Sequence, residues 1–149
     1  MTKAAVLDTS LQRTHEWLRD IADELGFDNE RAAYAALRGT LHAIRDRLPT
    51  ELVAHFGAEM PMLVRGIYYE GWHPSADRLK AAHDSDFRDS MHRELQAHDE
   101  LQDVERVARS VFSVLDRRME PGQIERVIDA LPKDTRRLWR EAQQEEELQ

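Results

Sequence analysis

The fold is decided by the stretch LHAIRDRL at residues 41–48, whose pattern recurs 71 residues later as FSVLDRRM at residues 112–119. Apolar residues occupy the first, fourth and eighth places of both stretches, which is the spacing of one face of an α-helix. The same offset relates Pro61 to Pro132. We therefore predict an internal repeat of helical units.

Stripes of apolar residues, interrupted by Gly and Pro, divide the chain into two copies of a four-helix unit. The first repeat covers residues 1–74, a linker covers 75–84, and the second repeat covers 85–149. Helices of the first repeat are expected at Leu11–Leu25, from a cap at Asp28 or Asn29 to Leu48, at Thr50–Ala58, and from Pro61 through Tyr68. Gly26 and Gly71 are expected to end helices, and Ser75–Ala82 is a candidate short helix within the linker.

The repeat also predicts how the units pack. A unit of about 70 residues buries too little apolar surface to be more than marginally stable alone. Two such units can bury similar apolar faces against each other about a two-fold axis. The predicted fold class is therefore all-α, a compact eight-helix bundle made of two pseudo-two-fold related four-helix repeats.

The composition narrows the classes of protein to which the chain can belong. With 29 acidic and 21 basic residues the net charge is −8, which disfavours nucleic acid as a partner because such binding rests on Lys and Arg neutralising phosphates. The sequence contains no cysteine, no stretch long and apolar enough for a membrane span, and no apolar segment typical of a signal peptide. We expect a cytoplasmic protein that binds neither nucleic acid nor membrane.

Aromatic and ionisable residues gather at the end of the fourth expected helix. This candidate site for a ligand or a protein partner comprises Arg65, Tyr68, Tyr69, Glu70, Trp72 and His73. The second repeat lacks the cluster, since Gln143 stands where the first repeat has Trp72. Two interpretations stay open: the run from Tyr68 to Pro74 docks a partner, or Trp72 and one tyrosine staple the following segment onto the helices.

The histidines do not form a metal-binding pattern. Five potential ligands lie close together in sequence: His83, Asp84, Asp86, His92 and His98. No two histidines among them are four residues apart, the spacing that places a pair of zinc ligands on one helix face. We predict no metal site and no cofactor.

Other polar positions have structural interpretations. His42 and His55 fall beside the apolar stripes and are expected at the surface or at its boundary. Four arginines at matching places of the two repeats are expected to donate hydrogen bonds to carbonyls left free at neighbouring helix ends: Arg47, Arg118, Arg65 and Arg136.

Three runs resemble a known family, the bacterial domain-of-unknown-function family 2267. They are residues 35–49, residues 59–66 and the aromatic run Tyr68 to Pro74. The resemblance covers nearly the whole chain, and its last two runs are its most specific part. It implies a small bacterial protein, associated with stress and sometimes joined to other regulatory modules, with no established activity.

The sequence favours a non-enzyme. It contains no GxSxG elbow, no glycine loop that binds phosphate, and no HExxH motif. The first hypothesis is a non-catalytic interaction or regulatory module that binds a protein partner or a copy of itself, with the run from Tyr68 to Pro74 in its surface. The alternative is a small-ligand-binding protein or a hydrolytic enzyme that uses Arg65, Tyr69, Trp72 and His73.

Overall fold

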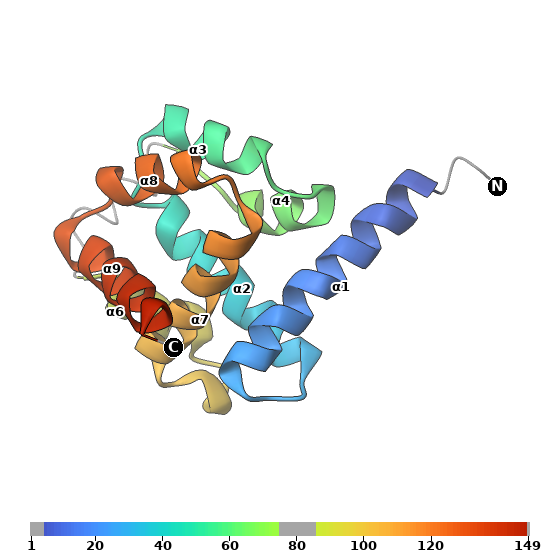
Figure 1. Ribbon diagram of the computed structural model, residues 1–149, viewed down its shortest axis with the longest axis horizontal. Helices are drawn as coiled ribbons and strands as arrows, with labels where there is room; N and C mark the ends of the chain where they lie inside the picture. The colour runs from blue at the N-terminus through green and yellow to red at the C-terminus, as the bar shows by residue number, and fades with distance from the viewer. Residues whose placement is uncertain (1–4, 75–85, 149) are drawn as a thin grey trace.

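The computed structural model describes residues 5–74 and 86–148 and confirms the all-α class. Within these ranges the chain forms eight α-helices, one short 3-10 helix and no strand (Figure 1). The helices are α1 (Ala5–Leu25), α2 (Glu30–Arg45), α3 (Thr50–Ala58), α4 (Met62–Tyr69), α6 (Phe87–Leu95), η2 (Asp99–Leu101), α7 (Val104–Arg118), α8 (Pro121–Ala130) and α9 (Lys133–Glu147). The predicted linker, with its candidate helix Ser75–Ala82, lies outside the described residues.

The helix ends follow local signals in the sequence. The side chain of Asn29 caps α2 by accepting hydrogen bonds from the N–H groups of Arg31 and Ala32, at 3.0 and 3.2 Å. Gly26 and Gly71 follow α1 and α4 with φ of 77° and 71°, a left-handed conformation that costs glycine little. Two boundaries differ from the prediction: α1 begins at Ala5 instead of Leu11, and α2 ends at Arg45, three residues early.

Helix α2 lies at the centre of the molecule, in contact with α1, α4, α6 and α7 (Figure 1). Ile44 of α2 and Leu115 of α7, which the repeat places at matching positions, are both fully buried. Leu41 and its counterpart Phe112 are also fully buried. These pairs have the burial that the repeat predicts, while the two-fold relation between the halves stays a prediction.

The expectation for His42 is wrong, whereas His55 is exposed as expected. Neighbouring helices surround α2 on several sides, so a residue beside its main apolar stripe is still covered, and His42 is only 3% exposed. Its Nε2 lies 2.8 Å from the carbonyl oxygen of Ile67 in α4. In the described ranges, every helix is too short or too polar to cross a membrane.

Candidate functional site

The predicted aromatic cluster forms a continuous series of ring contacts. Phe56 meets Tyr68 edge to face at a centroid distance of 5.7 Å, Tyr68 meets Tyr69 at 4.9 Å, and Tyr69 meets Trp72 at 5.5 Å. Tyr68 is fully buried, and its hydroxyl donates a hydrogen bond to the Val53 carbonyl at 2.9 Å. Burial raises the pKa of Tyr68 far above the usual range of a tyrosine. Tyr68 is therefore part of the core.

The segment after α4 turns back onto these rings. Gly71 reverses the chain, and the Trp72 N–H donates to the Tyr69 carbonyl at 3.0 Å. The Trp72 side chain is half-buried and packs against the core, which is the geometry of a staple. Glu70 and His73 are exposed. The arrangement brings the aromatic residues together and leaves the two ionisable ones at the surface.

The expectation for the arginines is confirmed at two positions and wrong at one. Arg65 donates to the carbonyls of Gly57, Ala58 and Met60 at 2.9 to 3.2 Å, and Arg136 donates to that of Leu131 at 3.0 Å. Arg47 lies just beyond the end of α2 and donates to the Ala43 carbonyl in the last turn of that helix, so it bonds a helix end as expected, but that of the preceding helix, and it also donates to the Ser90 hydroxyl. Arg118 instead pairs with the carboxylates of Glu16 and Asp20, because α1 lies beside the end of α7.

A polar pocket of about 280 Å³ adjoins the end of α4. Arg45 is 3% exposed and donates to the carbonyls of Tyr68 and Glu70, at 2.8 and 3.0 Å. Arg38 donates to the Glu70 carboxylate at 2.6 Å, and this bond holds the pKa of Glu70 below its usual value. His42, Arg93 and Glu94 also line the pocket. Helix α2 thus binds the last turn of α4 through three polar side chains.

This pocket was not predicted, although the sequence contains a signal for it. Arg38, His42 and Arg45 follow one another at spacings of four and three, so they form a polar stripe on one face of α2. A polar stripe that other helices cover needs polar neighbours on that side, because buried polar groups require hydrogen-bond partners. The end of α4 supplies them as carbonyl groups.

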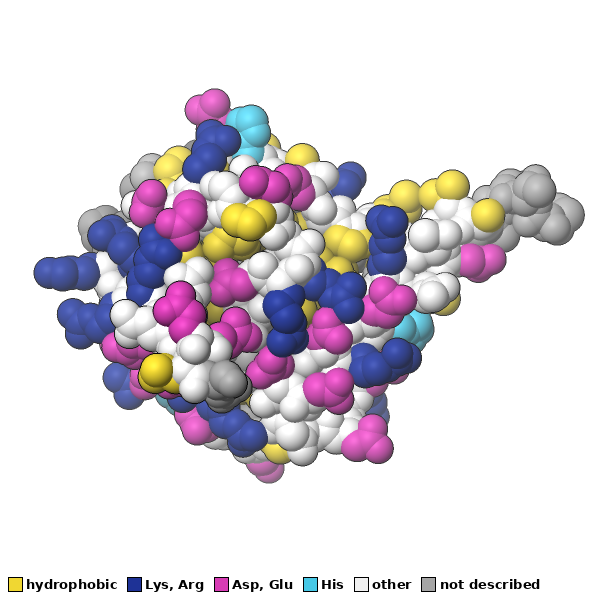
Figure 2. Space-filling model, viewed as in Figure 1, with side chains coloured by type: hydrophobic (Ala, Val, Ile, Leu, Met, Phe, Trp, Pro, Cys, Tyr) yellow, Lys and Arg dark blue, Asp and Glu magenta, His cyan; other side chains and the backbone are white. Residues whose placement is uncertain are grey.

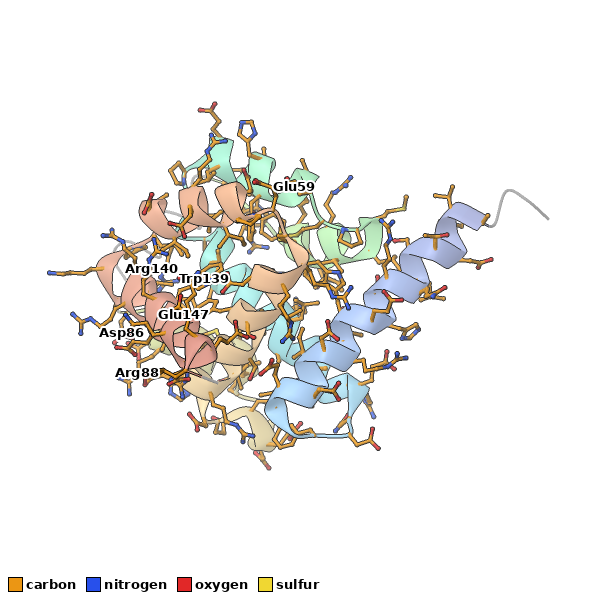
Figure 3. The ribbon with its side chains drawn as sticks, in the orientation of Figure 1. Glu59, Asp86, Arg88, Trp139, Arg140 and Glu147 are labelled. Atoms are coloured by element: carbon orange, nitrogen blue, oxygen red, sulfur yellow. The ribbon has the colours of Figure 1, made fainter. Side chains whose placement is uncertain are left out.

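A half-buried polar cluster centred on Asp116 lies between α7 and α9. Trp139, labelled in Figure 3, donates its indole N–H to the Asp116 carboxylate at 3.1 Å, and Gln143 approaches the same oxygen at 3.4 Å. Burial is the main influence and raises the pKa of Asp116 to about 6, while both hydrogen bonds oppose the rise. Asp116 therefore changes charge near neutral pH.

Two of the five potential metal ligands, His83 and Asp84, lie outside the described residues. In the described part of the chain, no three His, Asp or Glu side chains converge in a way that holds a metal ion.

Five of the seven exposed large apolar side chains among the described residues gather at the other end of the molecule. The N-terminal half of α1, residues 5–13, projects beyond the helices that cover the rest of it, and we call it the arm (Figure 1). Apolar side chains are visible on the projecting helix and where it meets the body (Figure 2). The arm surface consists of Val6, Leu7, Leu11, Met62 and Leu63, which are 40 to 64% exposed.

A groove of about 450 Å³ separates the arm from the start of α4. This arm groove is lined by Ala5, Val6, Thr9, Ser10, Arg13, Met60, Pro61, Met62 and Arg65. The Leu63 N–H donates to the Ser10 hydroxyl at 3.2 Å, so α4 is tied to α1 beside the groove. Of the predicted site residues, Arg65 alone is among those lining it. The arm surface was missed because the first helix was expected to begin at Leu11.

A known protein family matches most of the chain. The model of a protein family described as an uncharacterized conserved protein (DUF2267) matches residues 14–138 of the chain. No curated protein matches it.

Proposed function

The chain belongs to DUF2267, a family of uncharacterized conserved proteins, and from this premise we propose that it is a non-catalytic interaction module. In this proposal it binds an amphipathic helix of a protein partner at the arm surface and the arm groove. The proposal rests on one observation, the exposure of Leu7 and Leu11.

Leu7 and Leu11 continue a stripe that is buried elsewhere in α1. Leu18, Ile21 and Leu25 are each at most 5% exposed, and Leu11 precedes Leu18 by seven residues, which places both on one face of the helix. Exposed apolar area is unfavourable at roughly 25 cal/mol per Å², and apolar patches on folded proteins commonly mark binding surfaces. A partner that covers the arm would extend the buried stripe to the start of the helix.

The shape and charge of the groove suggest the partner's chemistry. Its floor and walls are mainly apolar, and its charged lining residues are Arg13 and Arg65. A helix with apolar side chains at positions i, i+3 or i+4, and i+7 fits between two helices in this way, with a carboxylate on its flank to meet the arginines. We propose that such a helix is the partner's recognition element.

The predicted site residues have a supporting part in this proposal. Tyr68 and Trp72 pack the end of α4 against the core, and Arg45 binds its last carbonyls. A fixed α4 holds Met62 at a defined distance from the arm, which lowers the entropic cost of binding. We also propose that the protein is cytoplasmic and regulatory, and that its two halves are copies of one four-helix unit.

The test is a binding measurement with matched variants. A protein captured from source cells is purified, and its affinity for the intact chain is measured by calorimetry. Leu7→Ser with Leu11→Ser should weaken binding by at least about tenfold, because each removes an apolar anchor. Leu148→Ser, at a residue that is 88% exposed in the C-terminal region, is the control and should bind normally. Equal affinities for all three proteins would refute the proposal.

A second candidate function, small-ligand binding, is favoured by the buried His42 and Arg45 in the polar pocket. The charged lining residues are three arginines and three carboxylates, Arg38, Arg45, Arg93, Asp46, Glu70 and Glu94, a set that suits a small zwitterion such as a free amino acid. Thermal shift with a panel of amino acids tests it. An amino acid that raises the melting temperature of the wild type but not that of Arg38→Met would support this function. If no amino acid raises the melting temperature, amino acids are excluded as ligands.

A further inference from the structure

We infer that the helix bound in the arm groove is the arm of a second copy of this chain, so that two copies exchange arms across a two-fold axis. This inference rests on the proposed function, and it names the occupant that the proposed function leaves open.

The arm surface carries both halves of such a contact. Leu7 and Leu11 form an apolar ridge one helical turn in length, while Val6, Met60 and Met62 line the adjacent groove. In a two-fold symmetric dimer the same surface is used twice, so a ridge placed beside a groove can fill the partner's groove while its own groove is filled. A different protein would fill the groove with a ridge of its own and need not cover Leu7 and Leu11. A second copy of this chain has both a ridge and a groove, so each copy covers the ridge and fills the groove of the other.

The charges of the arm and the groove are complementary. The arm carries two charged residues: Asp8, which is exposed, and Arg13, which lines the groove. The residues that line the groove include Arg13 and Arg65 and no carboxylate. A second arm therefore brings one carboxylate to a groove that presents two guanidinium groups, which fixes its orientation.

The net charge of −8 works against association and predicts a salt dependence. The like net charges of two chains repel each other, and salt screens this repulsion beyond the Debye length, which is about 8 Å at physiological ionic strength. The apolar contact is not weakened by salt in this way. Dimerisation should therefore be tighter at moderate than at very low ionic strength.

Sedimentation equilibrium of the purified intact chain, from about 1 to 200 μM, measures the association directly. The expected species is a dimer of twice the 17.4 kDa chain mass. Leu7→Glu with Leu11→Glu should sediment as a monomer with unchanged helical content, because both residues are exposed in the single chain. The control Leu148→Glu should dimerise like the wild type.

Charge reversal tests the arrangement of the arms. Asp8→Arg and Arg13→Glu should each weaken the dimer several-fold, since each opposes like charges, and the combined variant should regain part of the loss. A wild-type chain that stays monomeric, or a Leu7/Leu11 variant that dimerises normally, would overturn the inference. If the wild type is monomeric but its capture of a different protein depends on Leu7 and Leu11, the proposed function stands and only the second copy is excluded.

Discussion

Gly57 of α3 faces the tyrosine rings so closely that alanine should not fit there. A β-carbon at this position would lie 2.7 Å from the Tyr69 hydroxyl oxygen and 2.9 Å from Cε2 of Tyr68. Tyr69 is half-buried and can shift, but Tyr68 is fully buried and bound to the Val53 carbonyl. The Gly57→Ala variant must therefore displace a ring that the core holds in place.

Two opposing effects set the magnitude. Alanine is favoured over glycine in a helix by about 1 kcal/mol, whereas overpacking a core costs about 1 to 3 kcal/mol. The difference between these effects predicts that Gly57→Ala lowers the free energy of unfolding by about 0 to 2 kcal/mol. Gly66 in α4 is the matched control, because a β-carbon there meets nothing within 4 Å. Gly66→Ala should raise the same free energy by about 0.5 to 1 kcal/mol.

Urea unfolding followed by circular dichroism gives both values. In a Tyr69→Phe background the closest atom is absent, so Gly57→Ala should cost less there than in the wild type. If Gly57→Ala stabilises the chain as much as Gly66→Ala does, the tyrosine rings do not pack against α3 as described.

Three further predictions concern stability. Ile44→Ala and Leu115→Ala should each cost about 2 to 5 kcal/mol in urea unfolding, and a loss below about 0.5 kcal/mol would remove that residue from the core. Arg65→Met should lower the free energy of unfolding by about 1 kcal/mol more than Arg136→Met, because Arg65 binds three carbonyls and Arg136 binds one. Equal losses of stability would contradict this capping role. Because the pKa of Asp116 is raised to about 6, the folded chain holds a proton that the unfolded chain releases at lower pH, so this residue lowers stability as pH rises from about 4 to 6. The free energy of unfolding of Asp116→Asn, relative to that of the wild type, should therefore rise by about 1 kcal/mol between pH 4 and 7, after allowance for solvent screening. A difference in melting temperature between the two proteins that stays constant over this pH range would refute the raised pKa.

The features that could be predicted from the sequence are those that depend on local chemistry. Asn29 caps a helix through its own neighbours, and Gly26 and Gly71 adopt a conformation that their lack of a β-carbon allows. The all-α class follows from apolar spacing over many turns. None of these inferences required knowledge of which helices meet.

The features that could not be predicted depend on tertiary neighbours. His42 is buried because α4 and α6 cover the side of α2 that its apolar stripe leaves free. Arg118 meets carboxylates of α1, which are about 100 residues away in sequence, so its partner could not be read from its position at a helix end. The arm surface was missed for a related reason, since a stripe predicts an apolar face but not which part of it the rest of the chain covers.

Hydrogen exchange of the backbone amides in residues 5–13 and 62–66 tests most directly whether the arm surface is where the protein binds. The measurement compares the dilute chain with the chain bound to its captured partner or concentrated into dimers. We predict that exchange in both segments slows by about tenfold or more on binding, because a covered helix end opens less often. Slowed exchange confined to other segments, with the arm unchanged, would contradict the account.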